Sequence, residues 1–323
     1  MKLISVIMPV YNAEEFIEEA IESILYQSFG DFEFIIVNDG STDESDRIIR
    51  KYADMDSRIQ YIVKENGGVA AALNEGLEKA NGKYVARMDA DDVSYPERFE
   101  VMYEYMETHT DIDICGSWAL ENGKKPLKKP IDDADIRLSM VIYSPFIHPT
   151  VFFRRDFLEK NNIRYSYTCA EDYDLWIRCS QIAYFGNVDK YLYMYRVHKN
   201  NVSGKNNADK FMFDDLRIKN EYSRIYGSEL LIRKHFLDVN FDWDDFVPYI
   251  GLLKTIMDST GVVFLPKRTC REISIILIRC SRNIKVSIVR YVDLMKMLSL
   301  PLRLRDVIYI FGKYIQLLIK CSM

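Results

Sequence analysis

The sequence predicts an α/β fold, with a mostly parallel sheet flanked by helices in residues 1–204 and a helical region in residues 205–323. Short apolar runs alternate four times with segments of helical period in the first ninety residues, the pattern of a parallel sheet with right-handed crossovers. After residue 204 the composition becomes helical. A chain of 323 residues has room for both regions.

Four apolar runs have the length and composition of buried parallel strands. They are residues 3–8, 32–37, 59–63 and 84–88. Between them, apolar positions recur at helical spacing in residues 14–26, 43–53 and 69–80. Ser41 or Thr42 can cap the second of these helices, and Asn81–Gly82 can end the third.

Residues 93–204 mix helices and strands, and we expect them to form a second half beside residues 1–92. The predicted helices are residues 96–109, with Pro96 in the first turn, 132–143, 155–160 and 170–182. The predicted strands are residues 112–116 and 150–153, and residues 184–196 form one or two more.

The net charge of −5 hides a strong asymmetry, because residues 254–323 carry 13 basic and only 4 acidic side chains. The six cysteines form no C-x-x-C pair, which is typical of reduced thiols in a cytoplasmic protein. The N-terminus does not match a signal peptide. No apolar run is long enough to predict a transmembrane helix.

A polar turn follows each of the four predicted strands. The turns are Tyr11–Asn12, Asp39–Gly40, Asn66–Gly67 and Asp89–Asp92. Because the carboxyl ends of parallel strands line one crevice, we expect these turns to converge on a ligand site.

The acidic turn predicts a metal site. Asp89 and Asp91 stand two apart, so on an extended chain they point to one side while Asp92 points away. Carboxylate oxygens suit Mg²⁺ or Mn²⁺. The alternative is a solvated acidic turn that caps the helix near Pro96.

Three further positions have both a structural and a functional interpretation. Asp39 is either an Asx-turn residue or a carboxylate that accepts a hydrogen bond from a nucleotide base stacked on Tyr11. Glu171 and Asp172 either stabilise a helix N-terminus or include a general base for an incoming hydroxyl. His198 is either a surface histidine or a metal ligand or phosphate donor.

Seven segments together resemble the inverting family 2 glycosyltransferases, which have the GT-A fold and serve bacterial polysaccharide biosynthesis, including capsule and O-antigen. The segments are residues 6–12, 37–43, 66–74, 86–92, 148–151, 170–176 and 195–198. The resemblance covers about the first 200 residues. It implies a nucleotide-binding half, an acceptor half and a site shared between them.

The resemblance implies a role for each candidate residue. Nucleotide-binding residues would be Pro9, Tyr11, Asn12, Asp39, Asn66, Arg87, Asp89 and Ala90. Asp91, Asp89 and His198 would hold Mn²⁺ or Mg²⁺. Asp172 would be the catalytic base, with Glu171 as the alternative. Trp118, His148 and Trp176 are weaker candidates for the acceptor or sugar pocket.

The implied activity is a metal-dependent inverting transfer of one sugar from a nucleotide-diphosphate donor, UDP by preference, to a hydroxyl of a glycan or lipid-linked glycan. No nucleic acid is expected as a partner. The chain lacks the Gln-x-x-Arg-Trp motif of processive synthases, which favours single transfer. It also has Leu73 where many members carry an arginine, so a positive contact to the donor is either missing or supplied by Arg87 or Lys64.

The alternatives to a glycosyltransferase are a nucleotidyltransferase and a degenerate sugar-binding protein, and the tail has two possible roles. A sugar-phosphate nucleotidyltransferase would need a glycine-rich basic loop after the first strand, and a degenerate sugar-binding protein would have lost a key acid. The basic amphipathic segments in residues 255–323 either lie on the anionic inner face of the cytoplasmic membrane or pack as a bundle.

Overall fold

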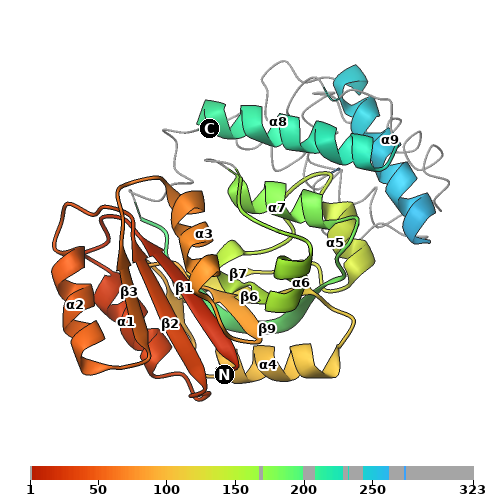
Figure 1. Ribbon diagram of the computed structural model, residues 1–323. Helices are drawn as coiled ribbons and strands as arrows, with labels where there is room; N and C mark the ends of the chain where they lie inside the picture. Colours follow the sequence, from red (N-terminus) through yellow and green to blue (C-terminus); the bar gives the residue numbers. More distant parts are fainter. Residues whose placement is uncertain are drawn as a thin grey trace. The chain divides into compact units, whose positions relative to one another are not determined.

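The computed structural model describes residues 2–166, 170–198, 208–227, 232, 243–261 and 273 (Figure 1). The chain divides into two compact units. The first contains Met1–Asp133 and Ser144–Ala208, and the second contains Ala134–Tyr143 and Asp209–Met323. The short stretch Ala134–Tyr143 therefore groups with the later helices, although it lies within residues 1–204 of the sequence.

The first half of unit one is the parallel sheet that the sequence predicts. Its strands are β1 (Ile4–Val10), β2 (Phe32–Asn38), β3 (Ile59–Val63) and β4 (Tyr84–Arg87), in the order β3-β2-β1-β4. All three pairings are parallel. The connecting helices are α1 (Ile17–Leu25), α2 (Ser45–Met55) and α3 (Val69–Lys79), shown from red to orange in Figure 1.

Burial explains why these strands read as continuous apolar runs. Every residue of β2 is buried, and in β1 only Pro9 is partly exposed. Helix α3 packs closely on β1 at Gly76, where a Cβ atom would lie only 2.4 Å from Cγ2 of Ile7. Gly76 therefore costs α3 some helix propensity but permits the helix to contact the sheet.

The second half of the unit extends the sheet and makes it mixed. Its strands are β5 (Val93–Ser94), β6 (Ile114–Glu121), β7 (Lys125–Leu127), β8 (Phe152–Arg154) and β9 (Phe185–Tyr195). Its helices are α4 (Arg98–Thr108), α6 (Arg155–Lys160) and α7 (Glu171–Cys179). Strand β8 runs antiparallel to both β4 and β6, and β9 pairs with β6 in parallel. Within the described residues the full order is β3-β2-β1-β4-β8-β6-β9-β5, with β7 on β6.

Several details differ from the sequence expectations. Strands β5 and β7 were not expected, because runs of two and three residues are too short to show a period. Helix α4 begins at Arg98, so Pro96 precedes the helix. Ser41 and Thr42 do not cap α2, since Glu44 is its N-cap residue and Oγ of Ser41 accepts a hydrogen bond from the backbone N–H of Asn12.

In the second unit the described helices are α5 (Asp133–Ser139), α8 (Ala208–Ile225) and α9 (Trp243–Thr260). The hydroxyl of Tyr222 on α8 donates to the carbonyl of Arg137 at 2.9 Å, which holds α5 against α8. Among the helices that the structure describes, none is long and apolar enough to cross a bilayer. Of the basic segment 255–323, only residues 255–261 and 273 are described, so the membrane prediction lies outside the described part.

Candidate active site

The loops after β1 and β2 are joined by Asn12. Its side-chain oxygen accepts the backbone N–H of Thr42 at 2.8 Å, and its own N–H donates to Oγ of Ser41 at 3.1 Å. The backbone of Asn12 has φ 49°, a left-handed conformation that asparagine tolerates well. Beside it, Tyr11 is 54% exposed and is accessible from solvent.

Asp39 organises the loop after β3. Its Oδ1 accepts from Nζ of Lys64 at 2.7 Å and from the N–H of Gly67 at 3.0 Å, and its Oδ2 accepts from the N–H of Gly68 at 2.8 Å. The carboxylate is buried, whereas Asn66 at the tip of the loop is exposed. A side chain at Gly67 would place its Cβ 2.8 Å from Nζ of Lys64, so the glycine lets this lysine approach Asp39.

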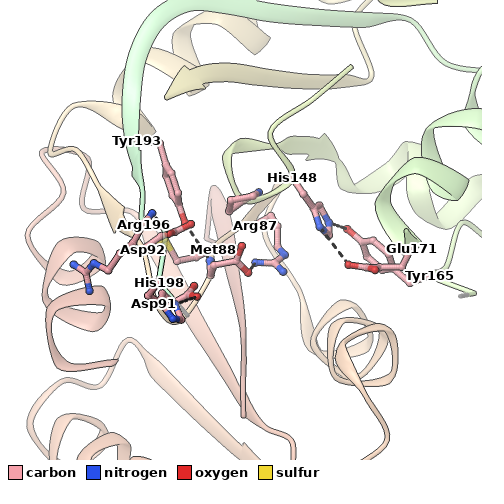
Figure 2. A network of polar contacts seen from close by, with 12 residues as sticks. Arg87, Met88, Asp91, Asp92, His148, Tyr165, Glu171, Tyr193, Arg196 and His198 are labelled. Atoms are coloured by element: carbon pink, nitrogen blue, oxygen red, sulfur yellow. Dashed lines mark hydrogen bonds and ion pairs between the residues drawn. The ribbon is translucent and has the colours of Figure 1, made fainter. Parts of the chain in front are cut away.

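The three carboxylates after β4 converge. Asp89, Asp91 and Asp92 each offer an oxygen, and these oxygens lie within 4.8 Å of one another. The expectation that Asp92 points away was wrong, because β4 ends at Arg87 and the chain then turns, so strand alternation no longer applies. Nε2 of His198 lies 2.8 Å from Oδ2 of Asp91 (Figure 2).

Electrostatics make this cluster a suitable cation site. Burial raises the pKa of Asp92 well above its usual value, and repulsion from Asp89 and Asp91 adds to the effect. Oδ1 of Asp92 accepts the N–H of Arg196 at 2.7 Å, but its buried Oδ2 has no hydrogen-bond partner among the described residues. Clustered, partly unpaired carboxylates with an adjacent imidazole fit a hard divalent cation.

Two buried arginines, Arg87 and Arg98, make polar contacts at the end of β4 and in the acidic turn. Arg87 forms an ion pair with Asp89, and burial raises the pKa of Asp89 although the cation opposes this. Arg98 is fully buried, and its Nη2 donates to the carbonyls of Arg87 at 2.7 Å and Pro149 at 2.8 Å. The hydroxyl of Tyr193 accepts the N–H of Asp89 at 3.2 Å. Arg98 and Tyr193 were not foreseen, since neither stands in a segment whose pattern indicated a site.

We expect Arg98→Met to destabilise the fold by about 3 kcal/mol, because two buried carbonyls lose their donor. Denaturant unfolding of the full chain measures this change. Arg50→Met is the matched control, since Arg50 forms an exposed i,i+4 pair with Asp46 that should contribute less than about 1 kcal/mol. Equal losses in the two variants would contradict a supporting role for Arg98.

The first turn of α7 presents two adjacent acids in different surroundings. Ala170, the N-cap residue of α7, has a left-handed backbone conformation with φ 53°. Asp172 faces Ser144, whose Oγ donates to its Oδ2 at 3.0 Å. Glu171 faces His148, with Oε1 of the acid 3.7 Å from Nδ1 of the imidazole. Burial, aided by Asp172, raises the pKa of Glu171 to about 7.

The three weaker pocket candidates lie in different environments. Trp176 is fully buried, and its ring lies 4.9 Å from that of Phe146 and 5.8 Å from that of Phe153, so it forms part of the core. Trp118 donates its indole N–H to the carbonyl of Lys129 at 2.9 Å. Only His148 lies against the acids of α7. Leu73 is buried, so it offers no polar contact at this edge of the sheet.

Comparison with known proteins places this chain in a family. The model of the glycosyl transferase family 2 matches residues 5–170. The O-antigen biosynthesis glycosyltransferase WbnJ of Escherichia coli is 35% identical over 207 residues, which are 61% of this chain and 81% of WbnJ. An uncharacterised glycosyltransferase of Methanocaldococcus jannaschii, MJ1057, is 36% identical over 207 residues, covering 60% and 71% of the two chains.

Solved structures agree on the fold. A crystal structure of S. aureus TarS residues 1–349 with UDP-GlcNAc has a TM-score of 0.60 at 19% identity, over 88% of this chain and 82% of the other. The Pyrobaculum calidifontis mannosyltransferase PcManGT, in complex with GDP-Man and Mn²⁺, has a TM-score of 0.51 at 15% identity, over 97% and 87%. At these identities the likeness shows the α/β GT-A-like fold alone. Because the family model spans half of the 323 residues, the chain belongs to glycosyl transferase family 2 and is a glycosyltransferase that takes its sugar from a nucleotide-sugar donor.

Proposed function

We propose that this glycosyltransferase is inverting and metal-dependent, and that it moves one sugar from a UDP-type donor to a hydroxyl of a glycan or lipid-linked glycan. One observation carries the proposal: a buried carboxylate at Asp39 after β2, an acidic cluster at Asp89–Asp92 after β4 and a base candidate at Asp172 in the first turn of α7 all belong to the same unit. Asp172 is close enough to Asp89 to raise the pKa of Asp89.

The proposed reaction is a single displacement. The acceptor hydroxyl attacks the anomeric carbon from the face opposite the nucleotide, Asp172 takes its proton, and the bond to the diphosphate oxygen breaks with inversion. Asp89, Asp91 and His198 would hold Mn²⁺ or Mg²⁺, and Asp92 is placed to join them. Such an ion, when bound, neutralises charge on the leaving diphosphate.

The other expected roles fit this arrangement as parts of the proposal. Tyr11 would stack on the base with Pro9 beside it, and Asn12, Asn66 and Ala90 would border the nucleotide. Arg87 is committed to Asp89, which leaves Lys64 as the cation nearest the base site. The family assignment gives no support to the nucleotidyltransferase alternative. The membrane-surface role stays a proposal for residues 255–323, as does the relation to polysaccharide biosynthesis.

Asp39 and Lys64 suggest which bases the donor can carry. A carboxylate has about four acceptor positions, of which Asp39 uses three, so one position on Oδ2 remains. The ammonium group of Lys64 has three donors, of which Asp39 and the carbonyl of Glu65 take two. If the base presents a ring N–H to Oδ2 of Asp39 and a C=O to Nζ of Lys64, the pair complements uracil or guanine. Cytosine and adenine present the reverse pattern.

A donor screen with Mn²⁺ or Mg²⁺ tests this function. We expect UDP-sugars, and at most GDP-sugars, to be hydrolysed or transferred. CDP and ADP should bind at least about tenfold more weakly than UDP, because one mismatched hydrogen bond to a charged group costs about that much affinity.

Lys64→Met should lower the affinity for UDP by about tenfold without weakening CDP binding further. Lys51→Met, which removes an exposed partner of Glu18, is the matched control. Hydrolysis of no nucleotide sugar would refute the function, and equal CDP and UDP affinity would refute the base-reading pair.

A further inference from the structure

A side-chain clamp joins the two halves of the catalytic unit. Asn74 lies on α3 and makes two hydrogen bonds to the backbone of Tyr165, which is 91 residues away in sequence. Its Nδ2 donates to the carbonyl of Tyr165 at 2.8 Å, and its Oδ1 accepts the N–H of Tyr165 at 2.9 Å. Such a two-point contact fixes both the position and the orientation of the Tyr165 backbone.

The clamp continues through two buried side chains. The hydroxyl of Tyr165 lies 3.0 Å from Nε2 of His148, and Nδ1 of His148 lies 3.7 Å from Glu171 (Figure 2). Burial lowers the pKa of His148 well below its usual value, so the imidazole is neutral; it hydrogen-bonds Tyr165 through Nε2 and contacts Glu171 through Nδ1. Tyr165 is 6% exposed, so its ring is largely shielded from solvent.

The two ends of this chain of contacts are functionally distinct. The N-terminus of α3 is the Gly68 amide that binds Asp39, in the proposed base pocket. The other end is Glu171, the first residue of α7, and the next residue is Asp172. We propose that Asn74, Tyr165, His148 and Glu171 are positioning residues that lock the first turn of α7 to α3, so that Asp172 faces the donor held at the same helix. This inference rests on the proposed function.

The arrangement also separates the roles of the two acids on α7. Two adjacent carboxylates in a buried site repel each other, so one of them is expected to retain a proton near neutral pH. Glu171 is the acid turned toward the buried imidazole, and its pKa is raised to about 7. Asp172, turned toward the hydroxyl of Ser144, is then the acid left for the role of base.

The test is Tyr165→Phe, which removes one hydroxyl and keeps the ring. We expect kcat for donor turnover to fall by about tenfold, the value of one buried hydrogen bond, with the donor KM within about twofold. Tyr52→Phe is the control, since it removes a hydroxyl that bonds Glu18 and Glu22 on α1. His148→Gln, whose amide can both donate and accept, should retain more activity than His148→Leu. A rise in KM with unchanged kcat would overturn the proposal.

A second readout needs no substrate. In ¹⁵N spectra of the full chain, the His148 signals, identified by their loss in His148→Gln, should move in Tyr165→Phe and in Glu171→Gln but not in Tyr52→Phe. If the His148 signals did not move, the proposed chain of contacts from Tyr165 through His148 to Glu171 would be refuted, even in an active enzyme. If the wild-type chain turned over no nucleotide sugar while these signals still moved, the contacts would stand and the proposed function would fail.

Discussion

Replacing Asp172 by asparagine should lower turnover by about 10²–10⁴-fold while leaving donor affinity within about twofold. The reason is that the proposed base acts only on the acceptor hydroxyl, so its loss removes an interaction made in the transition state. Asparagine keeps the size of the side chain and can still accept the hydrogen bond from Ser144. Steady-state kcat and calorimetric titration with the nucleotide diphosphate measure the two quantities separately.

Two variants decide between the acids of α7. Glu171→Gln should cost less than Asp172→Asn, since glutamine resembles the protonated acid that we propose beside His148. Ser144→Ala removes the hydroxyl that bonds Asp172 and should lower kcat modestly without altering donor affinity. A larger loss in Glu171→Gln would exchange the two roles. A parallel loss of donor affinity in Asp172→Asn would show that the residue holds the donor instead.

The sequence predicted most of the parallel half of the fold because its elements follow periodic rules. Strand β3 was predicted at the observed bounds, residues 59–63, and β2 differs by one residue. Every residue of β2 is buried, whereas in the edge strand β3 only Ile59 is buried, and both strands carry mostly apolar residues. The convergence of polar turns followed from the topology, and two of the turns are connected: Asn12 donates its N–H to Ser41 and accepts the N–H of Thr42.

The parts that sequence reasoning missed depend on contacts between distant segments. No local pattern relates Asn74 to Tyr165, or Arg98 to the carbonyl of Pro149. These contacts depend on how the segments that precede β8 and α7 pack in the folded chain. The prediction that Asp92 points away was wrong for a different reason, because side chains alternate between the two faces only while the strand continues. Trp176 is fully buried, and its ring lies 6.0 Å from that of His148, so its proposed role beside the acids of α7 stays a prediction.

Replacing Asp91 by asparagine should weaken Mn²⁺ binding and lower metal-supported turnover by at least about 100-fold, since one charged ligand of a cation that stabilises the leaving group by several kcal/mol is lost. Mn²⁺ titration of the free protein, followed by calorimetry or EPR, gives the affinity without reference to activity.

The surrounding groups make this expectation specific to the cluster. Asp91 is the carboxylate nearest His198, and Asp92 offers a buried oxygen that lacks a partner among the described residues. Asp92→Asn should therefore also weaken Mn²⁺ binding, whereas the exposed Asp54→Asn should not change it. If Asp91→Asn bound Mn²⁺ as tightly as the wild type, or if chelation of divalent ions left turnover unchanged, the metal role would be refuted. The three acids would then serve the fold alone.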